Sequence, residues 1–348
     1  MDRLKFWIRN NQLVAFFCLT LILSWGLGFS FYLVFQDGYE FLFPISAVAI
    51  CAPALTGIII SRLCDNEPGN NSKQPFWRAF VIALAVSSVI FLANNVIINR
   101  AVISPIMMLF TPIVVSPVAY VFGAAFSRFP TVRRYLSTVF QVRFVWGWLL
   151  LAPVVLLGLN LLSIWFSNLL GRQTVQLSNL PFKRFDLVKV LAISFLYQIF
   201  FFNLSGEEVG WRGFTLPRLL AQTNPIIASM VLTFFWAIYH AFYWGALGDP
   251  VMTTQYWIDT FIRLFPATVI ISCFYIHSKG SILVAGITHA AANTFFTYLP
   301  GLDWPVHTAT IYGFSLVIII LERWWEELPD SGTIYTHSGL MMETEDRV

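Results

Sequence analysis

About ten runs of mostly apolar residues follow one another along this 348-residue chain, each close to the ~20 residues that a helix needs to cross a bilayer. The runs cover residues 11–35, 41–61, 79–99, 102–127, 145–170, 187–214, 225–246, 256–276, 281–299 and 308–322. This succession predicts an all-α, polytopic transmembrane helical bundle. We therefore expect a multi-pass integral membrane protein of the plasma (cytoplasmic) membrane, surrounded by the lipid bilayer.

Composition agrees with a membrane protein, since 57% of the residues are hydrophobic and only 11% are charged, against about 25% charged in soluble domains. The net charge of +3 does not indicate a nucleic-acid partner, because the basic residues lie in short loops between apolar runs. Lys and Arg in short loops mark the cytoplasmic side, and their distribution predicts that both termini are cytoplasmic. The loop near 171–186 is the exception to this distribution. The four cysteines form no CxxC pair and are interpreted as small apolar packing residues.

The distribution of charge along the chain suggests four parts. Residues 1–186 form transmembrane helices of unassigned role, with almost no charge at membrane depth. Residues 187–300 carry the polar groups described below, and residues 301–325 contain one more transmembrane helix. Residues 326–348 are polar and acidic, which is typical of a flexible tail.

Two adjacent glutamates, Glu207 and Glu208, interrupt one of the most apolar stretches of the chain. Carboxylates at membrane depth are costly unless they are paired or functional. Glu208 and Arg212 are spaced i, i+4, so a helix would place them on one face as an ion pair. Glu207 would point about 100° away from Glu208 and could act as a general base on water. The alternative is a cytoplasmic loop in which all three charges are solvated.

Two later apolar runs each carry a histidine. His240 lies in the run 225–246, and His289 is followed four residues later by Asn293 in the run 281–299. A membrane histidine can simply hydrogen-bond to a neighbouring helix, and a structural His–Asn bond is the corresponding alternative for the second run. Three polar signals on three separate spans are harder to explain in this way than any one of them. We therefore expect a shared site.

Other membrane chemistries lack their motifs. There is no H-E-x-x-H zinc-protease motif, no G-x-S-G serine site and no Walker A sequence. An ion or solute transporter remains an alternative, although such folds usually show Gly or Pro breaks in paired halves, and the sequence shows no internal repeat.

The polar residues of the three spans together resemble the CPBP family. This is the CAAX-protease and bacteriocin-processing group, also called Abi, and it is related to the Ras-converting CAAX endopeptidase. The family pattern is E-E-x-x-x-R, then F-x-x-x-H, then H-x-x-x-N or H-x-x-x-D, on successive membrane helices. Here the pattern is Glu207-Glu208-x-x-x-Arg212, Trp236-x-x-x-His240 and His289-x-x-x-Asn293. The resemblance covers residues 190–300, and Trp236 departs from it by replacing Phe.

The resemblance implies an intramembrane endopeptidase. Glu207 and His240 would activate a water molecule, His289 and Asn293 would stabilise the oxyanion, and Glu208, Arg212 and Trp236 would support them. No cofactor is favoured, because Asn is a poor zinc ligand and a good oxyanion donor. The alternative is zinc held by Glu207, His240 and His289, since two histidines and a carboxylate can bind that metal.

The implied substrate is a membrane-associated peptide or protein, such as a prenylated CAAX-type terminus or a leader peptide. A non-catalytic family member that serves as a membrane scaffold or immunity factor is the other alternative. A shared site also sets a structural condition. The sixth helix must continue through Arg212, and the seventh must begin soon after it. We predict that the sixth helix ends at Pro217, because proline disrupts a helix interior.

Overall fold

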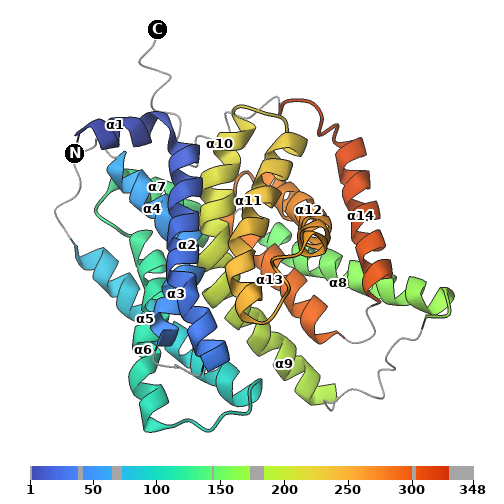
Figure 1. The fold of residues 1–348 in the computed structure, drawn as a ribbon, viewed down its shortest axis with the longest axis horizontal. Helices are drawn as coiled ribbons and strands as arrows, with labels where there is room; N and C mark the ends of the chain where they lie inside the picture. The colour runs from blue at the N-terminus through green and yellow to red at the C-terminus, as the bar shows by residue number, and fades with distance from the viewer. Residues whose placement is uncertain are drawn as a thin grey trace.

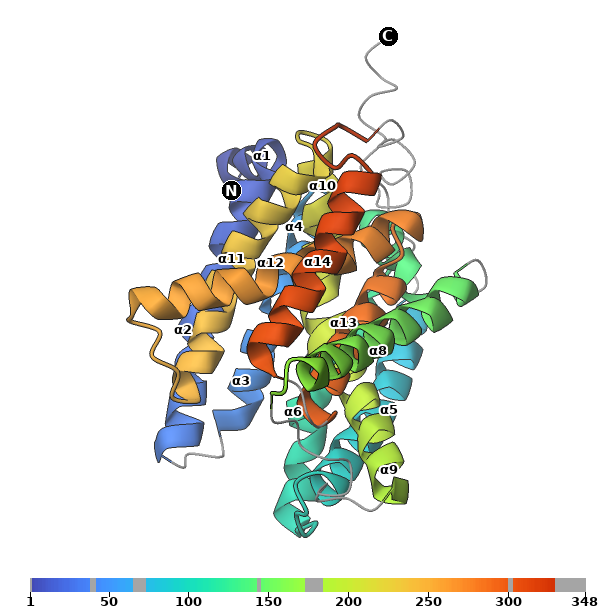
Figure 2. The same ribbon diagram turned by 90° about the vertical axis from the view of Figure 1, so that its right-hand side faces the viewer.

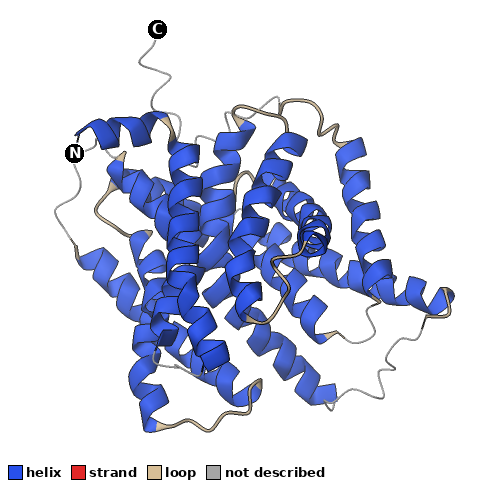
Figure 3. Ribbon diagram, in the orientation of Figure 1, coloured by secondary structure: helices blue, strands red, loops and turns tan. Residues whose placement is uncertain are grey.

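The computed structural model describes residues 2–37, 42–64, 73–142, 145–172, 184–299 and 303–328 of the chain. All regular secondary structure in these segments is helical (Figure 3). The predicted all-α class is therefore confirmed. The predicted tail 326–348 lies outside the described residues beyond Leu328, and the division of the chain into four parts stays a prediction.

The helices follow the apolar runs closely (Figure 1). They are α1 (Asp2–Asn10), α2 (Gln12–Asp37), α3 (Phe43–Ile50), α4 (Ala52–Leu63), α5 (Gln74–Ile97), α6 (Pro105–Ala124), α7 (Pro130–Leu136), η2 (Ser137–Phe140), α8 (Trp146–Leu169), α9 (Arg184–Tyr197), the π-helix η4 (Gln198–Thr215), α10 (Leu216–Leu220), α11 (Pro225–Ala246), α12 (Thr254–His277), α13 (Ile282–Tyr298) and α14 (Trp304–Leu321).

Eight of these helices, or helix runs, are long and apolar enough to cross a membrane. A ninth span is possible if α3 and α4, which are bent by 63° at Cys51, cross as a pair. The predicted span 281–299 corresponds to α13, which has 17 residues. The chain is thus a multi-pass membrane protein. The count of ten spans and the cytoplasmic placement of both termini stay predictions.

Elements from both ends of the chain meet at one end of the bundle. Figures 1 and 2 place α1, α10 and the end of α14 there. Arg218 of α10 donates from Nε to Gln12 Oε1 at 2.9 Å, and Asn224 Nδ2 donates to the Trp325 carbonyl at 3.1 Å. Helix α12 is seen nearly end-on in Figure 1 and lies crosswise between α11 and α14 in Figure 2.

The sixth predicted span is a single helical run over Asp186–Leu220. The prediction of an unbroken helix through Arg212 is confirmed, whereas the predicted end at Pro217 is wrong. Pro217 occupies the first turn of α10, where the backbone hydrogen bonds change from the π-helical to the α-helical pattern. A proline is tolerated at a first helical turn because its missing N–H is not needed there. A π-helical segment of 18 residues is itself unusual, since such backbone mostly occurs as single-turn bulges near functional sites.

Helix α11 begins directly after this run. Asn224 caps it by accepting a hydrogen bond from the Ile227 N–H at 3.0 Å, and Pro225 occupies its first position. The long helix and α11 therefore run antiparallel from one tight turn. Glu207 and His240 lie at similar distances along the chain from this turn, so they reach similar depths in the bundle. The condition for a shared site is met.

Glycines allow the π-helix to pack closely against its neighbours. A Cβ atom added to Gly210 would lie 2.4 Å from the Pro53 carbonyl carbon, in the first turn of α4. A Cβ atom added to Gly286 of α13 would lie 2.8 Å from Leu204 Cβ. Close backbone approach through small residues is a common way to pack helices in membranes. Here it fixes the helix that carries both glutamates.

Gly210→Ala is therefore expected to destabilise the protein by about 1–3 kcal/mol, the usual cost of overpacking, because its new methyl group would meet backbone atoms that cannot rotate away. Thermal unfolding of the purified protein in detergent measures the effect. The control is Gly158→Ala in α8, where the added Cβ has no heavy atom within 4 Å. An equal melting temperature for both variants would contradict the close packing at Gly210.

Candidate active site

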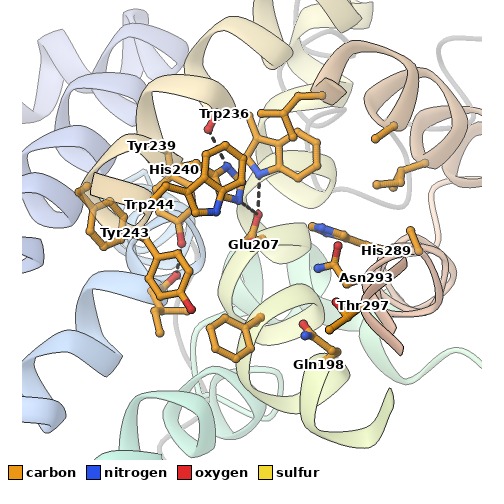
Figure 4. Close-up of a pocket in the computed structure, with 17 residues that line it drawn as sticks. Gln198, Glu207, Trp236, Tyr239, His240, Tyr243, Trp244, His289, Asn293 and Thr297 are labelled. Atoms are coloured by element: carbon orange, nitrogen blue, oxygen red, sulfur yellow. Dashed lines mark hydrogen bonds and ion pairs between the residues drawn. The ribbon is translucent and has the colours of Figure 1, made fainter. Parts of the chain in front are cut away.

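Three helices place the four predicted catalytic side chains around one cavity of about 320 Å³ (Figure 4). Glu207 comes from η4, His240 from α11, and His289 and Asn293 from α13. Glu207 and His289 are buried, with 4% of the surface of each residue exposed. The sequence prediction that these residues converge is confirmed. Their chemical roles stay a prediction.

Glu207 and His240 face one another across the cavity. Glu207 Oε2 lies 3.8 Å from His240 Nε2, which is longer than a hydrogen bond but within the reach of one shared water molecule. The other ring nitrogen, Nδ1, lies 2.9 Å from the Trp236 carbonyl oxygen and is placed to donate to it. In the neutral ring this leaves Nε2 with its lone pair directed towards Glu207.

Trp236 does more than replace the Phe of the family pattern. Its indole Nε1–H donates to Glu207 Oε2 at 2.5 Å, and the side chain is almost completely buried. A phenylalanine at this position could not donate a hydrogen bond. The departure from the pattern therefore supplies a direct donor to the carboxylate, which holds Glu207 in place on the cavity wall.

Glu208 contacts different partners from Glu207, as predicted from the angle of about 100° between adjacent side chains on a helix. Its Oε1 accepts from Arg212 Nη1 at 2.8 Å and lies 2.7 Å from His289 Nδ1. Glu208 and Arg212 are completely buried, and the guanidinium carbon of Arg212 lies 4.9 Å from the Trp236 ring centroid. The predicted i, i+4 ion pair is thus present. It also fixes the orientation of His289 from behind the cavity.

Sequence reasoning missed several cavity residues. Trp244 stacks on His240 with ring centroids 4.5 Å apart and 24° between the ring planes. Tyr239 donates from its hydroxyl to the Ile50 carbonyl at 2.7 Å and so attaches the cavity wall to the bend between α3 and α4. Gln198 and Thr297 line the lower part of the cavity in Figure 4. Of these residues, only Trp244 could have been predicted from the sequence, because a residue four positions after His240 lies on the same face of a helix.

The zinc alternative fits this geometry poorly. Glu207, His240 and His289 do not offer three ligand atoms that all lie within 4.8 Å of one another, although another group of residues in the described part of the chain does. The contact of His289 Nδ1 with Glu208 leaves Nε2 as the only nitrogen of that ring that could bind an ion. The three candidate ligands would have to move together before they could share one ion.

A second cavity of about 330 Å³ adjoins the first. The two cavities share Trp244, Asn293 and four apolar residues of α12 and α13. The second cavity continues towards Arg263 and Trp304 through mainly aliphatic and aromatic side chains. A chain segment bound at the predicted catalytic side chains would therefore have adjoining space next to Asn293.

Comparison with known proteins agrees with this site. Residues 189–295 match the model of the Rce1-like family, described as type II CAAX prenyl endopeptidase Rce1-like. The chain is also 28% identical over 149 residues to CAAX prenyl protease 2 of Methanococcus maripaludis. That match covers 41% of this chain and 52% of the relative, so the chain spans about half the length of the curated relative. The matched region includes η4, α11 and α13, which carry all the predicted motifs. Residues 189–295 are thus similar to the Rce1-related branch of the CPBP family.

Proposed function

We propose that this protein is an intramembrane endopeptidase that hydrolyses peptide bonds of membrane-associated substrates. The observation that carries the proposal is the convergence of Glu207, His240, His289 and Asn293 on one cavity within the bundle. Acyl transfer to water requires a general base for the water molecule and hydrogen-bond donors for the oxyanion. Here a carboxylate and an imidazole lie side by side, opposite two nitrogen-bearing side chains.

In the proposed reaction, a water molecule binds between Glu207 and His240 and attacks the scissile carbonyl carbon. The Glu207–His240 pair accepts the proton that the water loses as the C–O bond forms. The same pair then returns that proton to the amide nitrogen as the C–N bond breaks. Water is consumed, and the products are a new carboxyl group and a new amine.

His289 and Asn293 would stabilise the oxyanion of the tetrahedral intermediate. With Nδ1 placed against Glu208, His289 can donate from Nε2 only when both ring nitrogens carry protons. Glu207 and Glu208 then balance Arg212 and doubly protonated His289, so four buried charges sum to zero.

The cavity favours an apolar peptide segment as the substrate, because aromatic and aliphatic side chains form most of its wall. A prenylated CAAX-type terminus and a leader peptide both satisfy this condition. The plasma membrane is the proposed location. Comparison of proteomes from cells that produce the wild-type protein or Glu207→Ala would identify the substrate as a protein that stays uncut only in the variant. If no protein accumulates uncut, the scaffold or immunity role is favoured instead.

Asn293→Ala is expected to lower the turnover number by about 10²–10³-fold, as loss of one oxyanion donor does in other hydrolases. Substrate affinity should change little, because the interaction strengthens only as charge develops. Steady-state cleavage of the substrate by purified protein separates kcat from KM. Thr297→Ala, in the same cavity and also on α13, is the control. Equal losses in both variants would point to a packing effect.

The same assay distinguishes the two chemistries. Activity that survives exhaustive chelation, together with the Asn293 effect, supports the metal-free reaction. Activity that is lost on chelation and restored by added zinc would overturn it. Asn293→Asp adds a further test, because a carboxylate would repel the oxyanion in the metal-free reaction but could improve a metal site.

A further inference from the structure

A second group of chemically active side chains lies outside the catalytic cavity, where α12 and α14 end. Cys273 and His277 are spaced i, i+4 in the last turns of α12, and Glu322 directly follows α14. One ligand atom from each of the three residues lies within 4.8 Å of the other two. These residues belong to none of the predicted motifs.

The separations match those of ligands around a metal ion. Cys273 Sγ lies 3.6 Å from Glu322 Oε1 and 3.6 Å from His277 Nδ1, which are also distances of weak sulfur hydrogen bonds. His277 Nε2 lies 3.6 Å from Glu322 Oε1, which is too long for a hydrogen bond. An N–H···O hydrogen bond would bring nitrogen and oxygen to about 2.7–3.2 Å. Ligand bonds of about 2.0–2.3 Å at tetrahedral angles separate neighbouring ligand atoms by roughly 3.3–3.6 Å.

Neighbouring groups already hold two of the ligands in the required orientation. His277 Nδ1 lies 2.9 Å from the Cys273 carbonyl oxygen and is placed to donate to it, which leaves Nε2 as the metal-binding nitrogen. Trp324 Nε1–H donates to Glu322 Oε2 at 2.8 Å, which leaves Oε1 free to face the other two ligands. Metal-binding histidines and carboxylates are typically oriented by such outer partners.

We propose that Cys273, His277 and Glu322 form a zinc-binding site that joins the ends of α12 and α14. A thiolate, an imidazole and a carboxylate are ligands that zinc accepts, and water can complete the tetrahedron. The side chains of His277 and Glu322 are 40% and 32% exposed, so the ion can enter from solvent. Binding converts the Cys273 thiol to a thiolate and releases its proton to water.

The site is independent of the proposed peptidase reaction, but it affects how metal analysis should be interpreted. One zinc ion per purified chain would not by itself indicate a catalytic metal, because this group could hold it. Chelation experiments on activity should therefore be repeated in a Cys273→Ser background, where this ion is lost and the catalytic cavity is unchanged.

The test uses untagged full-length protein in detergent, stripped with a chelator and titrated with Co²⁺ as a spectroscopic probe. We expect one equivalent to produce a thiolate-to-cobalt charge-transfer band and the visible bands of tetrahedral cobalt. Zn²⁺ should displace the cobalt and bleach both. Cys273→Ser should abolish the charge-transfer band. His277→Ala and Glu322→Gln should each weaken zinc binding by at least about 10–100-fold, the loss found even for outer-shell partners.

Cys18→Ser is the matched control, because Cys18 is a free, exposed cysteine of α2. It should leave the titration unchanged. The proposal is overturned if the wild-type protein gives no thiolate band, if the band persists in Cys273→Ser, or if Cys18→Ser removes it. A melting temperature that zinc raises in the wild-type protein but not in His277→Ala would show independently that the ion joins the two helices. Equal shifts in both proteins would contradict that role.

Discussion

Glu207→Gln is expected to lower cleavage by the purified protein by about 10²–10⁴-fold, the range that a general base contributes. The amide has the same shape as the carboxylate, and its oxygen can still accept the hydrogen bond from Trp236 Nε1. The amide cannot accept a proton from the water molecule that the proposed reaction places between Glu207 and His240, whose Nε2 lies 3.8 Å from the carboxylate oxygen. Folded yield and melting temperature should therefore stay close to those of the wild-type protein.

Glu326→Gln provides the matched control, since this glutamate lies outside the cavity and has a side chain 49% exposed. Its activity should equal that of the wild-type protein. His240→Ala should lower turnover as Glu207→Gln does, and the double variant should lose little more, because residues that act as a unit are not additive. Full activity in Glu207→Gln would remove the glutamate from the reaction and leave the shared cavity without its proposed base.

The helices could be predicted because each depends on a pattern within one segment, and the shared site could be predicted because each of its motifs lies within one helix. Apolar runs of bilayer length marked the long helices, and the i, i+4 spacing of Glu208 and Arg212 marked an ion pair that the structure contains. Convergence of three helices followed from the cost of leaving carboxylate and imidazole groups in lipid without partners. That argument needs no knowledge of how the helices are arranged.

The features that were not predicted depend on contacts between segments far apart in the chain. The bend between α3 and α4 brings Pro53 against Gly210, and the Ile50 carbonyl accepts from Tyr239. Ile50, within the first 186 residues, thus lines the cavity, although nothing in the composition of that segment indicates it. The π-helical backbone of η4 and its continuation past Pro217 were missed for the same reason, since neither has a local signal.

Trp236 and Cys273 each make contacts that no isolated motif indicates. Trp236 departs from the family pattern, yet it donates a hydrogen bond to Glu207 that Phe could not make. Cys273 is interpreted as an apolar packing residue because it has no CxxC partner, and it does pack against an apolar cluster. Its sulfur also contacts His277, one helical turn away, and Glu322, which directly follows α14. A group formed by two segments cannot be recognised from the spacing within one of them.

Arg212→Ala is expected to destabilise the protein by about 3–5 kcal/mol, the usual cost of leaving one member of a buried ion pair without its partner. The intact pair is not a large source of stability in itself. Nε and Nη2 of Arg212 and Oε2 of Glu208 have no hydrogen-bond partner in the described part of the chain. The loss comes instead from Glu208, which would stay completely buried and negative, with His289 as its remaining partner. Folded yield and activity should therefore fall together.

Arg172→Ala is the control, because Arg172 pairs with Asp303 at 3.3 Å with 49% of its side chain exposed. Loss of that pair should cost no more than about 1 kcal/mol. Glu208→Gln combined with Arg212→Ala removes both charges and should recover much of the stability that Arg212→Ala loses. The recovered protein should still cleave poorly, because the carboxylate that orients His289 at Nδ1 is no longer present. If Arg212→Ala instead folds normally but has no activity, the guanidinium takes part in substrate binding or in the chemical step. The buried pair would then belong to the catalytic machinery.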